Sequence, residues 1–186
     1  VATFFISQTW LAAMLVPGQT EFAEADTNNA FFSIVQMISN HGWQVAFLAM
    51  NALAVGIAGI GFMGMIHFLA YQKVRGINVS ALCSRSSKKL AGDWRGIQGN
   101  FGPAGTKMNL SDITTWRKFD GLISDSGIDL VDICLPPDQH AEATIAALKA
   151  GKHVFCEKPM ALNLPDARRM LRACEQANVR LTIGFV

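Results

Sequence analysis

The sequence predicts an α/β fold with a parallel sheet, and two observations support this prediction. An apolar run at 54–58 passes directly into the pattern G-x-G-x-x-G, formed by Gly59, Gly61 and Gly64, and then into a helical pattern. From Met50 onward, apolar β-type runs alternate with helical segments, as a sheet with crossover helices requires. Together they indicate a Rossmann fold, which is a doubly wound parallel sheet with helices on both faces.

Each glycine of this pattern has its own physical reason. Gly59 allows the tight turn from strand to helix, Gly61 lets a pyrophosphate approach the backbone, and Gly64 lets the helix pack closely on the strand. The helix start that follows includes Phe62 and Met63, and it offers N–H donors and a partial positive charge to phosphates. We therefore expect these five residues to bind a dinucleotide cofactor.

The remaining elements follow in the same alternating order. Gly76 and Gly151 end two of the helices, Pro136 stops a strand, and Asn163 is a plausible N-cap of the last helix. The predicted strands are residues 54–58, 77–83, 129–135, 153–156 and 179–185. The predicted helices are 62–74, 87–91, 138–151 and 163–177, with a loop at 92–105 and with a short element and a helix, centred on 116–124, within 113–126.

Residues 1–49 do not join this pattern, and we expect them to be an N-terminal extension of uncertain structure that is dispensable for a domain at 50–186. No Asp, Glu, Lys or Arg occurs from 27 to 72, so a membrane segment within 31–66 is an alternative. Two features argue against it. No Lys or Arg lies in the first 72 residues to set a topology, and the glycines form no G-x-x-x-G pair.

Composition argues against other classes of function. The 186 residues carry a net charge of +2, which suits an anionic cofactor but is too weak to indicate nucleic-acid binding. The four cysteines have no C-x-x-C spacing and the four histidines are scattered, so no metal site is predicted. We expect buried, reduced thiols and a cytoplasmic protein.

A more specific signature, Gly-Lys-His-Val-Phe-Cys-Glu-Lys-Pro, lies at 151–159. Together with the glycine pattern and with Val-Asp-Ile-Cys-Leu-Pro-Pro at 131–137, it resembles the Gfo/Idh/MocA family of nicotinamide-dependent oxidoreductases over about 52–186, the family's N-terminal Rossmann domain. The resemblance implies hydride transfer between the cofactor and a sugar, cyclitol or related polyol. It also implies a cis peptide bond before Pro159.

The resemblance further assigns roles around the crevice of the sheet. Lys158 is the expected catalytic residue, because its ammonium can polarise or protonate a substrate oxygen during hydride transfer. Glu157 would orient this lysine or contact the nicotinamide ribose, His140 would lie near the nicotinamide, and Leu135 and Pro136 would shape the crevice edge. Each of these roles has an alternative. Glu157 and Lys158 could be an exposed pair at the strand end, and His140 could lie at the surface. Pro136 could simply end the strand.

The end of the second predicted strand bears on the choice between NAD and NADP. An NAD-selective fold places Asp or Glu there to accept the ribose 2′-hydroxyl, but residues 83–89 read Cys-Ser-Arg-Ser-Ser-Lys-Lys. Ser84, Arg85 and Lys88 would suit a 2′-phosphate, so we expect NADP in preference to NAD. A solvated basic loop is the alternative.

The family's second domain, which supplies most substrate contacts, has no counterpart in these residues. We therefore expect the chain alone to be inactive, and the full-length protein to be a homo-oligomer without nucleic-acid or membrane partners. Two rival functions remain: a glycosidase-type enzyme of the same family that uses the cofactor transiently, and a nucleotide-binding or regulatory module without turnover.

Overall fold

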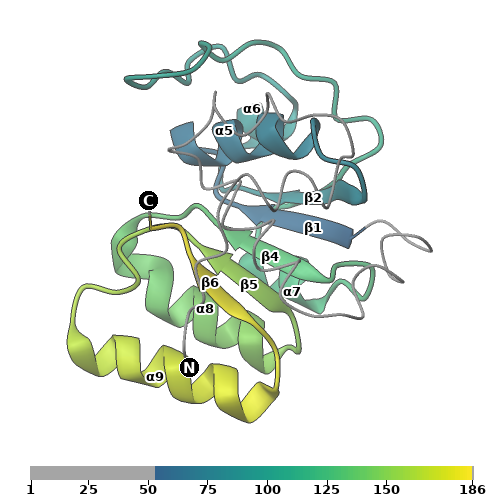
Figure 1. Cartoon of the computed structure of the whole chain (residues 1–186). Coiled ribbons are helices and arrows are strands. Elements are labelled where there is room, and N and C mark those ends of the chain that lie inside the picture. The colour runs from purple at the N-terminus through teal and green to yellow at the C-terminus, as the bar shows by residue number, and fades with distance from the viewer. Residues whose placement is uncertain (1–52, 186) are drawn as a thin grey trace, which may run out of the picture.

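The computed structural model describes residues 53–185, so the predicted extension at 1–49 lies outside the described residues. The described chain forms a six-stranded sheet in the order β3-β2-β1-β4-β5-β6, with every strand pair parallel (Figure 1). This order and the helices on both faces confirm the predicted Rossmann architecture.

The elements alternate along the chain as the sequence predicts, with shorter bounds. The strands are β1 (Leu53–Ala58), β2 (Ile77–Cys83), β3 (Thr114–Trp116), β4 (Leu130–Ile133), β5 (His153–Cys156) and β6 (Leu181–Ile183); the helices are α5 (Phe62–Tyr71), α6 (Ser87–Leu90), α7 (Phe119–Ser124), the 3₁₀ turn η1 (Pro137–Gln139), α8 (His140–Lys149) and α9 (Leu164–Ala177).

The predicted start of the helix before β4 is wrong. The sequence predicts a short element and a helix within 113–126, with the helix centred on 116–124, but Trp116 ends strand β3, and its carbonyl oxygen accepts the N–H of Ser84 at 3.0 Å. The Thr-Thr-Trp sequence of β3 consists of β-branched and aromatic residues, which favour strands. The helix starts only at Phe119.

Two apolar layers lie on opposite faces of the sheet. Helix α5 covers one face, where Met65 and Phe68 pack with Val55 and Ile57 of β1, while α7, α8 and α9 cover the other (Figure 1). Because both faces are covered, the central strands are nearly continuously apolar.

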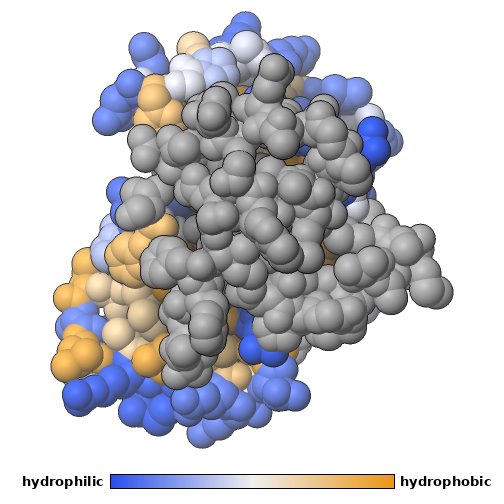
Figure 2. Space-filling view, in the orientation of Figure 1, coloured by the Kyte–Doolittle hydropathy of each residue, from blue (hydrophilic) through white to orange (hydrophobic). Residues whose placement is uncertain are grey.

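Helix α9 shows how its sequence sets its bounds. The side chain of Asn163 accepts the N–H of Asp166 at 2.9 Å, which confirms the predicted N-cap. At the other end, Asn178 adopts the left-handed conformation with φ 51°. Hydrophilic residues lie along the lower edge of the molecule, where the outer face of α9 meets solvent (Figure 2), while Met170 and Ala173 are buried.

Within residues 53–185, no helix has the length and apolar character needed to cross a bilayer. The part of the alternative membrane segment that the structure describes, residues 53–66, forms β1, the glycine turn and the start of α5. Its remaining part lies outside the described residues.

Candidate functional site

A cavity of about 920 Å³ lies at the carboxyl ends of the strands. Open α/β sheets bind ligands at this edge, where the strand order reverses between β1 and β4. Its volume lies in the range typical of cofactor sites. Of the sequence-predicted residues, the cavity wall includes Gly59, Gly61, Phe62, Met63, Ser84, Arg85, Leu135, Pro136, His140, Glu157 and Lys158.

The glycine turn has the geometry that its sequence predicts. Gly59 has φ +100°, in the left-handed region, and a side chain there would meet the backbone of Cys134. A side chain on Gly64 would meet the carbonyl oxygen of Gly59. By contrast, a Cβ on Gly61 would have nothing within 4 Å, so the missing side chain there leaves open space beside the backbone.

The start of α5 presents N–H donors of the kind that bind anions. The first N–H groups of an α-helix have no partner within the helix, and those of α5 lie at Phe62 and Met63, on the cavity wall. The ammonium of Lys89 donates a 2.6 Å hydrogen bond to the carbonyl oxygen of Ile60 and so adds a positive charge at the glycine turn. The sequence interpretation missed this residue.

Two arginines form a basic rim on the side of β2. Ser84 and Arg85 line the cavity as predicted, and Arg117, which the sequence interpretation did not single out, lines it beside them. The guanidinium of Arg117 donates to the carbonyl oxygen of Arg85 at 3.1 Å and to the hydroxyl of Ser87. These bonds attach the segment after β3 to the segment after β2.

Lys88 does not take the place that the sequence predicted for it. It is absent from the cavity wall, and its exposed ammonium pairs with Asp93 at 3.5 Å. The reason is the short helix α6, which starts after the N-cap Ser86 and turns Lys89, rather than Lys88, toward the glycine turn.

His140 connects two walls of the cavity. It is buried, with 1% exposure, which excludes the surface alternative. Its Nδ1 lies 2.8 Å from the carbonyl oxygen of Pro159, and its Nε2 lies 2.8 Å from that of Leu135. The ring therefore joins the end of β4 to the Lys158–Pro159 bond, which is cis, as the resemblance implies.

Glu157 and Lys158 have different environments, so they are not an exposed pair. The Lys158 side chain is exposed and lines the cavity, where its ammonium can donate hydrogen bonds. Glu157 is buried, and its Oε2 accepts the backbone N–H of Lys158 at 3.2 Å. The carboxylate thus supports the backbone that carries the lysine.

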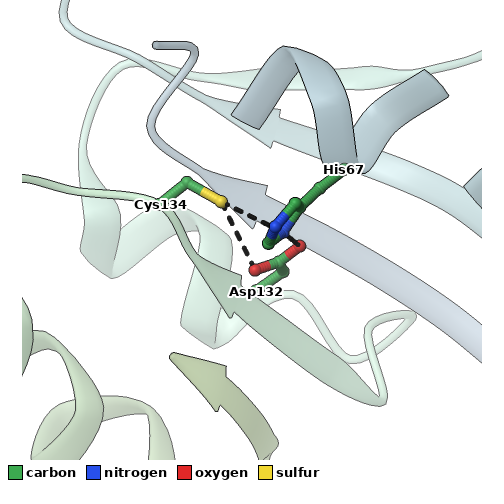
Figure 3. Close-up of side chains that lie close together, drawn as sticks. All are labelled: His67, Asp132 and Cys134. Carbon is green, nitrogen blue, oxygen red and sulfur yellow. Dashed lines mark hydrogen bonds and ion pairs between the residues drawn. The ribbon is translucent and has the colours of Figure 1, made fainter. Parts of the chain in front are cut away.

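A buried polar cluster that the sequence interpretation missed lies next to Glu157, and Figure 3 shows three of its members, His67, Asp132 and Cys134. The Nδ1 of His67 on α5 lies 2.8 Å from Oδ2 of Asp132 on β4, and its Nε2 lies 3.1 Å from Oε1 of Glu157. In the second contact the two atoms lie at an ion-pair distance, but they are not aligned as in a good hydrogen bond. The Tyr71 hydroxyl and the Cys134 thiol donate to Asp132 at 3.0 and 3.5 Å.

The charge of Asp132 sets the protonation of this cluster. Burial by itself lowers the pKa of His67, but the Asp132 charge and the contacts of the ring with Asp132 and Cys134 together raise the pKa well above 6.5. Burial also raises the pKa of Tyr71 well above 10.0, and the nearby Asp132 charge adds to this shift. These shifts favour the imidazolium form of His67 and the neutral, donating form of Tyr71.

Three of these side chains, His67, Asp132 and Cys134, are of metal-ligating types, and their polar atoms lie within 4.8 Å of one another. The sequence interpretation, which predicted no metal site, did not place them together. Their contacts have the lengths of hydrogen bonds, and burial raises the pKa of the Cys134 thiol to about 12. We therefore describe them as a hydrogen-bonded cluster.

Comparison with known proteins identifies the family. A family model described as the oxidoreductase family with an NAD-binding Rossmann fold matches residues 53–185. The chain belongs to the Gfo/Idh/MocA oxidoreductase family. This membership confirms the resemblance of the three sequence motifs.

Members of the Gfo/Idh/MocA family to which the chain is similar include enzymes named for sugars and cyclitols. Levoglucosan dehydrogenase of Pseudarthrobacter phenanthrenivorans is 32% identical over 144 residues, covering 73% of this chain and 34% of the relative. Myo-inositol 2-dehydrogenase of Thermotoga maritima is 31% identical over 133 residues, covering 72% and 36%. The chain thus spans about a third of the length of these relatives.

Solved structures agree with the family assignment. The scyllo-inositol dehydrogenase of Lactobacillus casei, solved with bound NAD(H) and scyllo-inositol, has a TM-score of 0.61 and 28% identity. The similarity covers 72% of this chain and 36% of that structure. The shared part is therefore the Rossmann domain.

Proposed function

We propose that this chain is the cofactor-binding part of an oxidoreductase that transfers hydride between NAD(P) and a sugar, cyclitol or related polyol. The observation that carries the proposal is that the glycine turn and Lys158 line one cavity at the carboxyl edge of the sheet. The names of the relatives, which include inositol, apiose and levoglucosan dehydrogenases, support this substrate class.

The order of the strands supports a direction for the bound dinucleotide. In Rossmann domains the pyrophosphate lies at the first helix start and the adenosine ribose beside the end of the second strand. The nicotinamide half then extends over β4 and β5, toward Leu135 and Lys158. When bound, the nicotinamide supplies or accepts the hydride, and the Lys158 ammonium hydrogen-bonds the substrate oxygen and moves its proton.

The basic rim supports a preference for NADP. The segment after β2 contains no carboxylate to accept a ribose 2′-hydroxyl, and Ser84, Arg85 and Arg117 offer donors suited to a 2′-phosphate. Lys89 is attached to the glycine turn and therefore serves the pyrophosphate rather than the 2′-phosphate.

A competition experiment tests this proposal on the 186-residue chain. NADPH fluorescence is followed while 2′,5′-ADP or 5′-ADP is added as the competitor, since these two ligands differ only in the 2′-phosphate. We expect NADPH to bind. We also expect 2′,5′-ADP to displace it with an affinity roughly 10-fold or more higher than that of 5′-ADP, because the 2′-phosphate gains a charge-assisted contact. Equal competition would refute the NADP preference, and no NADPH binding would refute the cofactor site.

We also propose a reducing compartment. The four cysteines of the chain all lie within the described residues and are free thiols, and Cys83 and Cys156 are buried. Reduced thiols of this kind are typical of the cytosol.

A further inference from the structure

The cluster next to Glu157 places titratable groups under the cavity, and buried charges are costly unless they are paired. Asp132 has no exposed surface and His67 has 1%. The groups come from three elements: His67 from α5, Asp132 from β4, and Glu157 from the position directly after β5. Two members of the cluster, Cys134 and Glu157, line the cavity wall, and Glu157 is the carboxylate of the two.

Asp132 accepts donors on both of its oxygens. Its Oδ2 lies 2.8 Å from Nδ1 of His67 and accepts the Tyr71 hydroxyl at 3.0 Å, and its Oδ1 accepts the Cys134 thiol at 3.5 Å. The hydroxyl and thiol contacts suit a carboxylate, which can only accept. The raised pKa of His67 and its ion-pair distances to Asp132 and Glu157 favour a protonated imidazole between the two carboxyl groups.

Glu157 is the second carboxylate that faces this imidazolium. One of its oxygens lies 3.1 Å from Nε2 of His67, and the other accepts the backbone N–H of Lys158. Two carboxylates and one imidazolium sum to one net negative charge. The ammonium of Lys158 is exposed to water, so the solvent screens its charge more strongly than the charges of the buried cluster.

We propose that this cluster, through Glu157, is an electrostatic element that favours the oxidised, positively charged nicotinamide over the reduced, neutral ring. The inference rests on the proposed function, because it needs the nicotinamide half of the cofactor to lie over β4 and β5. Its chemistry is simple: a negative charge at the cavity floor attracts a cationic ring and is indifferent to a neutral one. His67 is then a positioning residue, which holds both carboxylates in place and limits their net charge to one.

The first test compares the affinities of NADP⁺ and NADPH for the 186-residue chain. Glu157→Gln removes the charge at the cavity wall and retains an oxygen that can accept the Lys158 N–H. We expect it to weaken NADP⁺ relative to NADPH by roughly 3- to 30-fold, as Coulomb's law gives for effective dielectrics between those of partly buried protein and water. The control is Tyr71→Phe, which removes a hydrogen bond to Asp132 without changing the charge and is expected to leave the ratio unchanged.

The outcomes separate this inference from the proposed function. If both nucleotides bind but Glu157→Gln changes their affinities equally, the electrostatic inference is wrong and the cofactor site stands. If neither nucleotide binds to the wild-type chain, the proposed function itself fails.

A second measurement is made on the wild-type chain, so it does not depend on whether a carboxylate variant folds. The ¹⁵N shifts of the His67 ring, identified by the signal lost in His67→Gln, report whether one or both ring nitrogens carry protons. We expect both to be protonated at pH 7 in the wild-type chain. A neutral ring would contradict the charge balance on which the inference depends.

Discussion

The carbonyl oxygen of Gly59 occupies the space that a side chain on Gly64 would need. A methyl group at position 64 must therefore displace the backbone of the turn itself. At Gly61 a Cβ would have nothing within 4 Å, and the φ of −96° suits any residue. The two glycines thus have different roles, in packing and in ligand access.

We expect Gly64→Ala to lower the free energy of unfolding by about 1–3 kcal/mol, the usual cost of overpacking. Gly61→Ala is its matched control and is expected to change stability by no more than about 0.5 kcal/mol while weakening NADPH binding. Urea unfolding and NADPH titration measure the two effects. Equal loss of stability in both variants would show that the assigned roles are wrong.

A second prediction concerns the basic rim. Arg85→Ala is expected to narrow the preference for NADPH over NADH by roughly 10-fold or more, because a charge-assisted contact to the 2′-phosphate is lost. Lys88→Ala serves as the control, since Lys88 pairs with Asp93 and does not line the cavity. Titrations of the wild type and of each variant with NADPH and with NADH measure this preference. A larger effect from Lys88→Ala than from Arg85→Ala would contradict the assignment.

The buried imidazolium predicts a pH dependence of stability. Burial is the largest single influence and lowers the pKa of His67, but the Asp132 charge together with the contacts to Asp132 and Cys134 outweighs it and raises the pKa well above 6.5. The folded state then holds a proton that the unfolded state releases above about pH 6.5. The contribution of His67 is fully present below that pH and falls by about 1.4 kcal/mol per pH unit until the folded-state pKa is reached.

Urea unfolding between pH 6 and pH 9 measures this slope. The difference in stability between the wild type and His67→Gln is expected to shrink as the pH rises, whereas the difference between the wild type and Tyr71→Phe stays constant. A wild-type advantage over His67→Gln that grows with pH would have the wrong sign.

Lys158 is expected to act in chemistry rather than in cofactor binding. Its side chain is exposed on the cavity wall, so Lys158→Met leaves the fold and the NADPH affinity of the chain unchanged. In the full-length protein the same change is expected to lower turnover by roughly 10²–10⁴-fold, as removal of a positioned acid or base does. Retained turnover with the wild-type pH profile would exclude Lys158 from the mechanism.

Local patterns predicted much of this fold and site. The G-x-G-x-x-G run identified the turn from Gly59 to Gly64, because Gly59 and Gly64 each answer a local steric demand. Predictions that depended on which side chain a short helix turns toward the cavity were less accurate. Lys88 and Lys89 are neighbours in sequence, and only the start of α6 after Ser86 determines which of them reaches the glycine turn.

The cluster of His67, Asp132 and Glu157 was missed because its members are 25 or more residues apart. The sequence did contain one indication of the cluster. Asp132 is a carboxylate inside an apolar strand run, so it needs a buried partner. Identifying that partner required knowing that α5 packs over β4, which no local pattern gives.

The central claim is that a dinucleotide binds from the glycine turn to the Glu157–Lys158 segment, and amide NMR shifts during NADPH titration test it most directly. We predict saturable shifts at Gly61, Met63 and Lys158. Gly76 and Gly151, which precede β2 and β5 at the opposite edge of the sheet, are expected to stay unshifted. Shifts confined to that opposite edge, or no saturable shifts in the folded chain, would contradict the account.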